Sequence, residues 1–536
     1  MINLDASDYH SFQSLCLGAM YFASRTAWKR STVFLMKALD EGRRRFLQTI
    51  AAAPVLPALA GEAPQAGGPR APFNAIQMGP HTILDEGIER CLDLIQDMAA
   101  INALMIYSHT YHGDIRKPAQ FLATDHGVPS REMRNRQLPA VWVKTHEQYY
   151  KNTTLRHQIP DSSFEYAQRD LFQEVQEPAR KRGMKVYARI LEGASPTIQN
   201  FSKVSTRDVY GKPLRVACWN HPEYRAWWNG TVEDLFRTYR LDGFQWGAER
   251  MGPLMNVISP WNDAAPACFC EFCMARGKDK GIDPERARKG FEELDVYVRG
   301  LMNGKARPAD GVFVGFLRVL IRYPEILAWE YQYRQSREEV QAGMYRTIKA
   351  IQPDADVGWH VDHQPSSWDL VYRAEMTYAE MAPHSDFIKF IAYHDVLGPR
   401  IRYWYLERFQ KTILGEIPLE HSLDLYYELF GYDKNREPKL DELANKGFSP
   451  DYVFRETKRS VASAEAKTKI YTGIGFDVPW GNRHLDADPE AVYQCVRKAF
   501  EAGANGIVVS REYEEMRVPN LKAVGRAIRE LSRKNG

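Results

Sequence analysis

After residue 72 the chain alternates short β-rich runs with helical stretches, and this alternation constrains the fold more than any other feature. Eight runs are predicted as strands: Ala103–Ser108, Lys185–Leu191, Leu214–Cys218, Gly243–Gly247, Asp356–Val361, Phe387–Tyr393, Lys469–Phe476 and Gly506–Ser510. The helices expected near them are Leu84–Met98, Pro222–Tyr239, Leu327–Ile351, Asp488–Ala502 and Asn520–Arg533. Eight such units favour a closed (β/α)₈ barrel, and an open doubly wound sheet is the alternative. No G-x-G-x-x-G follows the first run, so no dinucleotide site is expected.

The surplus length of the chain falls after particular strands, which indicates long loops on one face of the barrel. About 75 residues separate the first two predicted strands, about 105 the fourth from the fifth, and about 75 the sixth from the seventh. Each interval begins at the carboxyl end of a strand, where barrel enzymes carry their active sites. We therefore expect one domain over residues 73–536, a (β/α)₈ TIM barrel with long βα loops.

The composition excludes several classes of protein. Apolar residues make up 44% and charged residues 26% of the 536 positions, which is typical of a globular chain and not of a disordered or multi-span membrane protein. The formal charge of +3 provides no basic bias for nucleic acid. Aromatic residues reach 12%, and such rings either fill cores or form flat binding faces. The composition leaves the oligomeric state open.

The first 60 residues contain a pattern typical of an export signal. Arg43 and Arg44 open a basic segment, and the apolar run Thr49–Ala60 follows it and ends in an A-x-A cleavage pattern. Adjacent arginines followed by x-Phe-Leu resemble the bacterial twin-arginine signal. We interpret residues 1–60 as an N-terminal extension with a signal peptide and residues 61–72 as a linker, with an Arg-rich helix start as the alternative. A start at Met36 would give a conventional leader, which leaves the true start codon open. We expect an exported protein, periplasmic or extracellular, without membrane association after cleavage.

Three closely spaced cysteines form the clearest metal-binding motif of the chain. Cys268, Cys270 and Cys273 make a C-x-C-x-x-C, whose sulfurs can surround one small ion, and zinc takes a fourth ligand to complete a tetrahedron. Cys218 is the candidate, because it ends the third predicted strand next to the loop after the fourth. We predict a structural zinc site with four cysteine ligands. A disulfide, free thiols or another metal are the alternatives, and an iron–sulfur cluster does not match the usual spacings.

The order of these motifs resembles a known family. The segment Cys218–Arg225, the strand ending in Phe244–Glu249 and the cysteine triple after it are similar to glycoside hydrolase family 42, which comprises retaining barrel β-galactosidases of clan A. The chain also resembles exported bacterial proteins classed as hypothetical glycosyl hydrolases. The resemblance implies a glycoside hydrolase that cleaves an oligo- or polysaccharide, with zinc on the four cysteines and Glu249 as acid/base.

The chain departs from this family near both catalytic positions. Ala248 precedes Glu249 where the family has an asparagine that contacts the sugar 2-hydroxyl, so sugar recognition must differ. The family's nucleophile is a glutamate on strand seven, where the terminal carboxylate here is Asp477. We therefore predict Asp477 as the nucleophile, without implying β-galactosidase activity. An ion pair with Arg250 that keeps Glu249 ionised is the competing interpretation. Other acids near strand ends compete for the nucleophile role: Asp362, Asp395, Glu512, Glu515 and Glu192.

Aromatic and polar residues gather at the same predicted strand ends. Indoles and phenols there would stack on pyranose rings, and polar side chains would hydrogen-bond hydroxyls. The predicted substrate-binding residues are Trp219, Asn220, Trp246, Arg250, Trp359, His363, Tyr393, His394 and Trp480. For any single tryptophan, core filling is the alternative. The sequence does not give the sugar, the linkage, exo or endo action, or retention or inversion.

Two other functions fit parts of the pattern. A metallohydrolase of the amidohydrolase kind would bind its metal with histidines at predicted strand ends. The candidates are His109, His112, His360, His363 and His394. Against this function, the first predicted strand lacks an H-x-H pair and the eighth ends without an aspartate. A barrel that binds sugars without cleaving them would lack one of the two carboxylates. Glu249→Gln separates the three functions, because it would abolish glycosidase turnover, preserve sugar binding and hardly affect a metal-dependent amidase.

Overall fold

A computed structural model describes residues 72–111, 124–127, 140–157, 166–192, 198–260, 264–305, 307–480, 483–484 and 486–534. The predicted export signal, the linker up to residue 71 and His112 lie outside these residues. Within the described ranges, no helix combines the length and the apolar character that crossing a bilayer requires.

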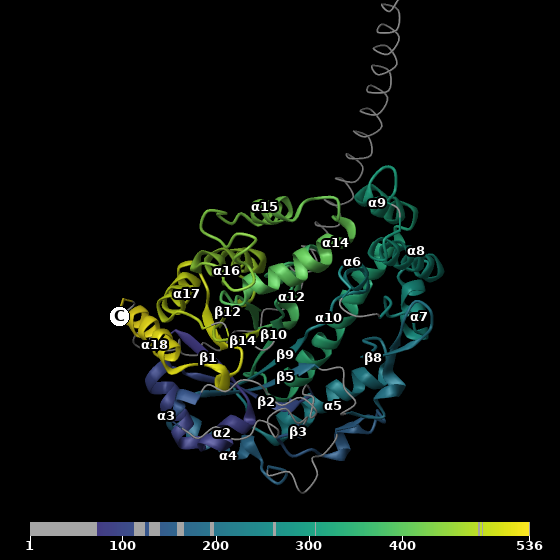
Figure 1. Ribbon diagram of the computed structural model, residues 1–536. Coiled ribbons are helices and arrows are strands. Elements are labelled where there is room, and N and C mark those ends of the chain that lie inside the picture. The colour runs from purple at the N-terminus through teal and green to yellow at the C-terminus, as the bar shows by residue number, and fades with distance from the viewer. Residues whose placement is uncertain are drawn as a thin grey trace, which may run out of the picture. The chain divides into compact units, whose positions relative to one another are not determined.

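Eight parallel strands of the described chain close into a barrel. In sequence order they are β1 (Phe73–Met78), β2 (Ala103–Thr110), β5 (Lys185–Glu192), β9 (Gly243–Ala248), β10 (Asp356–Val361), β11 (Phe387–Ile391), β12 (Lys469–Gly475) and β15 (Gly506–Ser510). Neighbours in the barrel follow the same order, and β1 pairs with both β2 and β15, so the ring has no open edge. Figure 1 shows the strands in the middle of a layer of helices. The prediction of a (β/α)₈ barrel is confirmed, and the doubly wound alternative is wrong.

The first barrel strand, β1, is missing from the predicted set of strands. Its sequence contains Asn74 and Gln77, two polar residues that weaken its apolar pattern. Both side chains are fully buried, and each has a hydrogen-bond acceptor elsewhere in the fold. Asn74 Nδ2 donates to Ala99 O at 2.8 Å, and Gln77 Nε2 donates to Gln245 Oε1 at 2.8 Å. The strand is therefore stabilised by tertiary hydrogen bonds that no local pattern reveals.

The third predicted strand is wrong as a barrel strand. Leu214–Cys218 does form a strand, β8 (Pro213–Ala217), but β8 pairs antiparallel with β7 (Ser205–Arg207) in a hairpin outside the barrel. This hairpin lies in the long connection between β5 and α5 (Pro222–Thr238). A strand's propensity does not specify its partner, so the sequence could not separate a barrel strand from a loop hairpin.

The predicted helices are present with bounds shifted by a few residues. The helices α5, α10 (Glu325–Ile351), α17 (Pro489–Glu501) and α18 (Val518–Lys534) correspond to four of them. The fifth, predicted over Leu84–Met98, divides at Gly87, whose φ of 86° ends α2 (Pro80–Glu86) before α3 (Ile88–Ala99). Two further helices, α4 (Leu171–Lys181) and α16 (Pro450–Ala464), also belong to the outer layer.

Additional helices fill the long connections at the carboxyl ends of the strands. After β9 come α6 (Pro253–Ile258), α7 (Glu271–Asp279), α8 (Pro284–Met302) and α9 (Val312–Arg322). After β10 come α11 (Leu370–Glu375) and α12 (Tyr378–Met381). After β11 come α13 (Leu397–Arg400), the π-helix η6 (Ile401–Phe409), α14 (Gln410–Ile413) and α15 (Leu419–Phe430). The surplus length therefore lies on the face that carries the chemistry of barrel enzymes.

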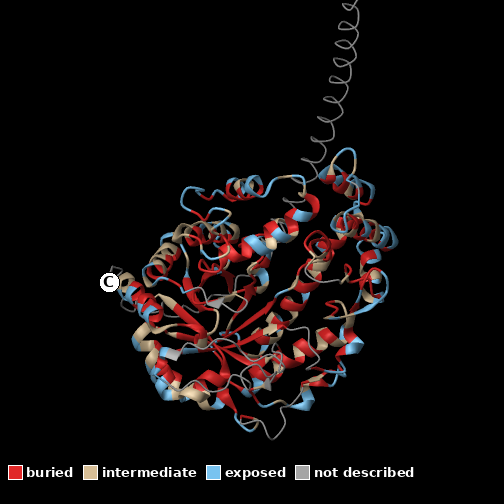
Figure 2. Ribbon diagram, viewed as in Figure 1, coloured by how far each residue is buried: buried red, intermediate tan, exposed pale blue. Residues whose placement is uncertain are grey.

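The barrel interior changes from apolar to polar along its axis. Alternate residues of each strand point inward, and one interior cluster is apolar: Ala75, Ala103, Met105, Tyr187, Phe387, Tyr471 and Val508. Further along the strands, the next inward-pointing side chains are polar and buried: Gln77, Gln245, Arg189 and Lys389. Figure 2 shows the buried strands at the centre of the helical layer. The carboxyl end of the barrel is thus a polar mouth on an apolar base.

Candidate active site and metal centre

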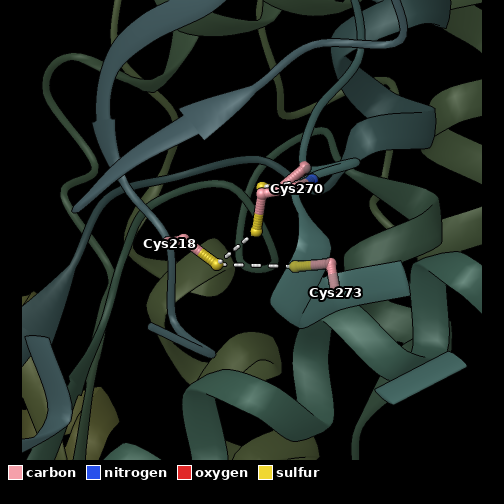
Figure 3. Close-up of side chains that lie close together, drawn as sticks. Cys218, Cys270 and Cys273 are labelled. Carbon is pink, nitrogen blue, oxygen red and sulfur yellow. Dashed lines mark hydrogen bonds between the residues drawn. The ribbon is translucent and has the colours of Figure 1, made fainter. Parts of the chain in front are cut away.

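Four cysteine thiols from two loops meet in a buried cluster. Cys218 follows β8, while Cys268, Cys270 and Cys273 surround the start of α7, and all four sulfurs lie within 4.8 Å of one another. Cys218 Sγ lies 3.4 Å from Cys270 Sγ and 3.5 Å from Cys273 Sγ (Figure 3). Sulfurs around a tetrahedral zinc ion with ~2.3 Å bonds are about 3.8 Å apart, whereas disulfide sulfurs are about 2.05 Å apart. The cluster can therefore hold a metal ion, and no disulfide joins its described members.

The backbone around the cluster favours thiolates. Arg207 N and Cys270 N both donate to Cys268 Sγ at 3.4 Å. Cys270 is the N-cap of α7 and Cys273 lies in its first turn, where the helix dipole stabilises negative charge. Hydrogen bonds from neighbouring thiols, Cys218 first, lower the pKa of Cys270, whereas burial raises the pKa of Cys268 and the neighbouring thiols raise that of Cys273. Deprotonated, N–H-bonded sulfurs are the state that a tetrahedral metal ion requires of its ligands.

Glu249 faces a cavity of about 390 Å³ at the carboxyl end of the barrel. It directly follows β9 with the same parity as the inward-pointing Gln245, and 43% of its side chain is exposed. This volume falls in the range of small-ligand sites. The cavity is lined by Glu192, Thr206, Leu214, Val216, Glu249, Arg250, Met251, Asn256, Ala264, Ala265, Ala267, Tyr333, His363, Gln364 and Trp404.

Arg250 pairs with Glu192 and not with Glu249. Its Nε donates to Glu192 Oε2 at 2.9 Å, its Nη2 bonds the other oxygen of the same carboxylate, and its Nη1 donates to Ala217 O at 2.6 Å. The guanidinium also lies 3.7 Å from the centroid of the Trp219 ring. The competing interpretation, in which Arg250 keeps Glu249 ionised, is wrong. Successive side chains along a strand point to opposite sides, so the side chain of Arg250 points away from that of Glu249. Arg250 still lines the cavity.

A buried histidine and lysine lie behind Glu249. His360 Nε2 is 3.4 Å from Glu249 Oε1, His360 Nδ1 is 3.3 Å from Lys389 Nζ, and Lys389 Nζ donates to Tyr393 Oη at 3.1 Å. Burial, reinforced by the charge of Lys389, lowers the pKa of His360 to about 3. A neutral imidazole that accepts from Lys389 at Nδ1 carries its proton on Nε2 and donates it to Glu249. Tyr393, predicted to bind sugar, is instead buried and contacts Lys389.

Asp362 is a second acid whose charge interacts with that of Glu249, although it is not among the residues that line the cavity. It directly follows β10 and is 1% exposed. Its Oδ1 accepts from Gln364 N at 2.7 Å, and its buried Oδ2 has no hydrogen-bond partner among the described residues. Burial and the negative charge of Glu249 raise the pKa of Asp362, while the charge of Arg337 opposes this. The neighbouring His363, which the sequence predicts to bind substrate, lines the cavity, and burial lowers its pKa to about 3.

Asp477, the predicted nucleophile, points elsewhere. It is 1% exposed and is not among the residues that line the cavity with Glu249. Its Oδ2 accepts from Arg517 N at 2.9 Å, and Asn520 Nδ2 lies 2.9 Å from both of its oxygens. Arg517 Nε donates to its Oδ1 at 3.1 Å. The carboxylate therefore holds the start of α18, and the structure does not bring it to Glu249.

Three tryptophans predicted to stack on sugar are core residues. Trp219, Trp246 and Trp359 are at most 2% exposed, and their rings pack against one another with centroids 5.8 Å (Trp219–Trp246) and 6.3 Å (Trp246–Trp359) apart. In β9 and β10 they alternate with the inward-pointing Gln245 and His360, so Trp246 and Trp359 face the helices. The alternative of core filling holds for all three.

The remaining predicted residues lie outside the cavity lining. Asn220 Nδ2 donates to Cys273 Sγ at 3.3 Å, so this side chain belongs to the thiol cluster. His394 is buried, which lowers its pKa to about 4. Trp480 is half-buried, with its ring centroid 5.8 Å from that of Tyr403. None of the three lines the cavity beside Glu249.

Two aromatic cavity residues were not predicted from the sequence. Trp404 lies on η6, its ring stacks on Trp368 at 5.3 Å, and its centroid is 6.2 Å from that of His363. Tyr333 comes from the middle of α10. Both lie on helices, which a search of strand ends passes over. The aromatic run around Trp404, in the long connection after β11, is the one local signal that could have found it.

The histidines of the amidohydrolase alternative do not form a ligand set in the described chain. Among those residues, the four cysteines are the one group of three or more side chains that could share a metal ion. His109 lies against His157, with ring centroids 4.5 Å apart, and His157 is bonded to Tyr150 Oη at 2.9 Å. The geometry of the mouth is thus a carboxylate arrangement, with the metal ligands in a separate cluster.

No family model matches the sequence, and no curated protein matches it either. Similar solved structures include the glycoside hydrolase domain of PgaB (BpsB) from Bordetella bronchiseptica, at 12% identity and a TM-score of 0.44 over 86% of this chain and 98% of that one. A β-galactosidase from Marinomonas ef1 has 9% identity and a TM-score of 0.47 over 86% and 59%. A β-galactosidase from Halorubrum lacusprofundi has 12% identity and a TM-score of 0.48 over 86% and 58%. The chain spans less than two thirds of either β-galactosidase.

Proposed function

We propose that this barrel is a glycoside hydrolase with Glu249 as its acid/base and Asp362 as the second carboxylate. The observation that carries the proposal is the position of Glu249: an accessible acid in a cavity of sugar size, whose charge raises the pKa of a second, buried acid, Asp362. Glycoside hydrolysis needs two carboxyl groups at the scissile bond, one protonated and one ionised.

The two acids lie in different environments, because the side chain of Glu249 is 43% exposed and Asp362 is 1% exposed. The charge of Glu249, together with burial, raises the pKa of Asp362, so ionisation of both acids is disfavoured. Burial and the charge of Glu249 favour the proton on Asp362 in the free protein, so the mechanism requires that substrate binding shift the proton to Glu249. The acid then protonates the glycosidic oxygen as its bond to the anomeric carbon breaks. Asp362, as carboxylate, then stabilises the positive charge that develops on the sugar. Water adds to the anomeric carbon and returns a proton to Glu249, while His360 keeps that side chain oriented.

We also propose zinc as the ion of the cysteine cluster. Four protein ligands close the coordination sphere, so the ion would be structural and supply no chemistry to the reaction. Its role follows from its neighbours. Cys218 ends the β7–β8 hairpin and Cys268 follows Ala267, and Leu214, Val216 and Ala267 line the cavity. A metal ion would hold two walls of the cavity together.

The N-terminal pattern supports a proposal on localisation. A twin-arginine signal over residues 1–60 would export the folded protein with its metal already bound, to meet an oligo- or polysaccharide outside the cytoplasm. Fractionation of expressing cells would test this, and retention in the cytoplasm of a chain with intact Arg43 and Arg44 would contradict it.

The test of the hydrolase function is a panel of nitrophenyl glycosides and polysaccharides with three variants. Glu249→Gln and Asp362→Asn are each expected to lower kcat/KM by roughly 10²- to 10⁴-fold. Asp477→Asn is the matched control, a strand-end acid outside the cavity, and is expected to retain turnover. Absence of turnover by the wild-type protein on the whole panel would favour a barrel that binds sugars without cleaving them. Full activity of Glu249→Gln would contradict the proposed mechanism.

A further inference from the structure

One side of the cavity that Glu249 faces is lined by the apolar face of a strand. Leu214 and Val216 line the cavity from β8, and both are half-buried. The residues that alternate with them, Pro213 and Arg215, are exposed. Successive side chains along a strand point to opposite sides, so one face of β8 belongs to the cavity and the other to solvent. The hairpin therefore presents apolar side chains to the cavity, although it lies outside the barrel.

A segment of small residues extends this apolar side. Three alanines of residues 264–267 also line the cavity. The backbone holds their segment beside the hairpin, because Val209 N donates to Pro266 O at 2.9 Å and Ala267 forms an antiparallel bridge with Asp208. The hairpin and this segment thus form one surface. We call it the apolar wall, and its members are Leu214, Val216, Ala264, Ala265 and Ala267.

The charged groups next to the apolar wall already have partners within the chain. Arg250 and Glu192 both line the cavity, and they form a two-point ion pair with 2.9 Å between Arg250 Nε and Glu192 Oε2. Arg250 Nη1 also donates to Ala217 O at the end of β8. Tyr224 Oη donates to Glu192 Oε1 at 2.5 Å. A ligand on this side would therefore have to break existing bonds to use either charge.

Thr206 and Asn256 add limited hydrogen-bonding capacity to this part of the cavity. Thr206, from β7, has a buried Oγ1 without a hydrogen-bond partner in the described part of the chain. Asn256 lines the cavity as well, but its Nδ2 already donates to Met251 O at 3.2 Å. A pyranose carries several hydroxyls, and burying a hydroxyl without a partner costs free energy. The apolar wall therefore suits an apolar group better than a second sugar.

The segment after β10 gives the cavity a different lining. His363 and Gln364 line it, and the buried Oε1 of Gln364 has no hydrogen-bond partner among the described residues. The ring of Trp404, also in the lining, lies 6.2 Å from that of His363. Polar side chains and an indole ring are the groups that bind the hydroxyls and the C–H face of a sugar. Since β9 lies between β10 and β5, Glu249 stands between this polar side and the side of Glu192 and the apolar wall.

We propose that the substrate is a glycoside with an apolar leaving group, an aryl or alkyl aglycone that binds against the apolar wall. The sugar, alone or at the end of an oligosaccharide, binds at His363, Gln364 and Trp404. Glu249 gives its proton to the aglycone oxygen as the bond to the anomeric carbon breaks. Water adds its hydroxyl to that carbon and returns a proton to Glu249, so the products are a free sugar and an alcohol or phenol. The inference rests on the proposed hydrolase function and names the class of its substrate.

The test measures binding to the full chain by calorimetry, so it does not depend on turnover. The probes are phenyl and methyl 1-thioglycosides of galactose, glucose, mannose and fucose, which resist hydrolysis and form pairs that differ only in the aglycone. A thio-linked disaccharide of each sugar represents a sugar as the leaving group. For at least one sugar, we expect the phenyl probe to bind at least about tenfold more tightly than the methyl probe, because the larger group removes more apolar area from water.

Variants of β8 locate this preference. Val216→Asn introduces an amide into the apolar wall and should reduce the preference for the phenyl probe to about threefold or less. Arg215→Asn, at the exposed neighbour on the other face of the strand, is the matched control and should keep the preference. Equal loss in both variants would contradict the position of the aglycone. If Val216→Asn does not fold, Leu214→Ala shortens another side chain of the wall and should lower the preference by about threefold.

The outcomes separate this inference from the hydrolase function. Equal binding, or no binding, of the phenyl and methyl probes for every sugar would overturn the apolar aglycone, even if glycosides are cleaved. Tighter binding of a thio-linked disaccharide than of the phenyl probe of the same sugar would also overturn it. Preferential binding of a phenyl probe with no cleavage of any glycoside would support the apolar wall as a binding surface and contradict the hydrolase function.

Discussion

Replacing Asp477 by asparagine distinguishes a nucleophile from a structural anchor. The sequence predicts the first role, and the hydrogen bonds to Arg517 and Asn520 indicate the second. Asparagine preserves the shape of the side chain and tolerates the left-handed backbone at this position, where φ is 56°. The substitution therefore removes the charge and one acceptor while the backbone keeps its conformation.

The magnitude follows from the burial of the two partners. Removing one member of a buried ion pair costs about 3–5 kcal/mol, but the Arg517 side chain is 36% exposed and regains water when its partner is neutral. The asparagine amide also faces Asn520 Nδ2 and Arg517 N, which are both donors. We expect a loss of about 2–3 kcal/mol, and for a chain of this size a decrease in Tm of about 2–3 °C.

Thermal unfolding followed by circular dichroism measures the decrease in Tm. The effect on catalysis is measured as turnover at 25 °C on a glycoside that the wild-type protein cleaves. We expect kcat within about threefold of wild type at full folding, because a nucleophile would lose far more. An unchanged Tm together with a loss of turnover of about 10³-fold or more would refute the structural role and restore Asp477 as the nucleophile.

Two further predictions concern the metal and the buried histidines. Metal analysis should find about one zinc per chain in the wild-type protein. Cys270→Ser should lose this zinc, whereas the control Cys495→Ser, at a buried cysteine outside the cluster, should keep it. Equal loss of zinc in both variants would contradict the site. Burial lowers the pKa of His157 to about 3 from about 6.5 in the unfolded chain, so below pH 6.5 the unfolded state binds a proton that the folded state does not. At pH 7.5, urea unfolding should give a lower free energy of unfolding for His157→Gln than for the wild-type protein. The gap between the two free energies should be smaller at pH 5, because the wild-type protein alone is destabilised by protonation of His157 in its unfolded state. A gap that grows on acidification would contradict this prediction.

The alternation of side chains along a strand explains why Glu249 lines the cavity and Asp477 does not. Glu249 directly follows β9, so its side chain keeps the inward alternation of Gln245 and faces the mouth. Asp477 lies two residues beyond the end of β12 and has the parity of the inward-facing Gly473 and Gly475. The chain has left the strand by then, and the positive φ at Asp477 turns its side chain toward α18.

The sequence alone determined what depends on local patterns. The alternation of β-rich and helical segments predicted the barrel and its long loops. The C-x-C-x-x-C motif predicted that three sulfurs lie close together, because they belong to one short segment, Cys268–Cys273. Such features are set by neighbouring residues, because propensity, periodicity and short spacings act within a few positions. The position of Glu249 at a strand end belongs to the same class.

Tertiary structure decided which groups meet. It closed the ring with β1, whose polar residues bond to distant acceptors, and it excluded β8 from the barrel. It paired Arg250 with Glu192 and bonded Asp477 to Arg517 and Asn520. Side chains of one type differ in role only through the charges and packing around them, and those arise from segments far apart in the chain. That is the physical reason why the acids and arginines of this mouth could be assigned only after folding.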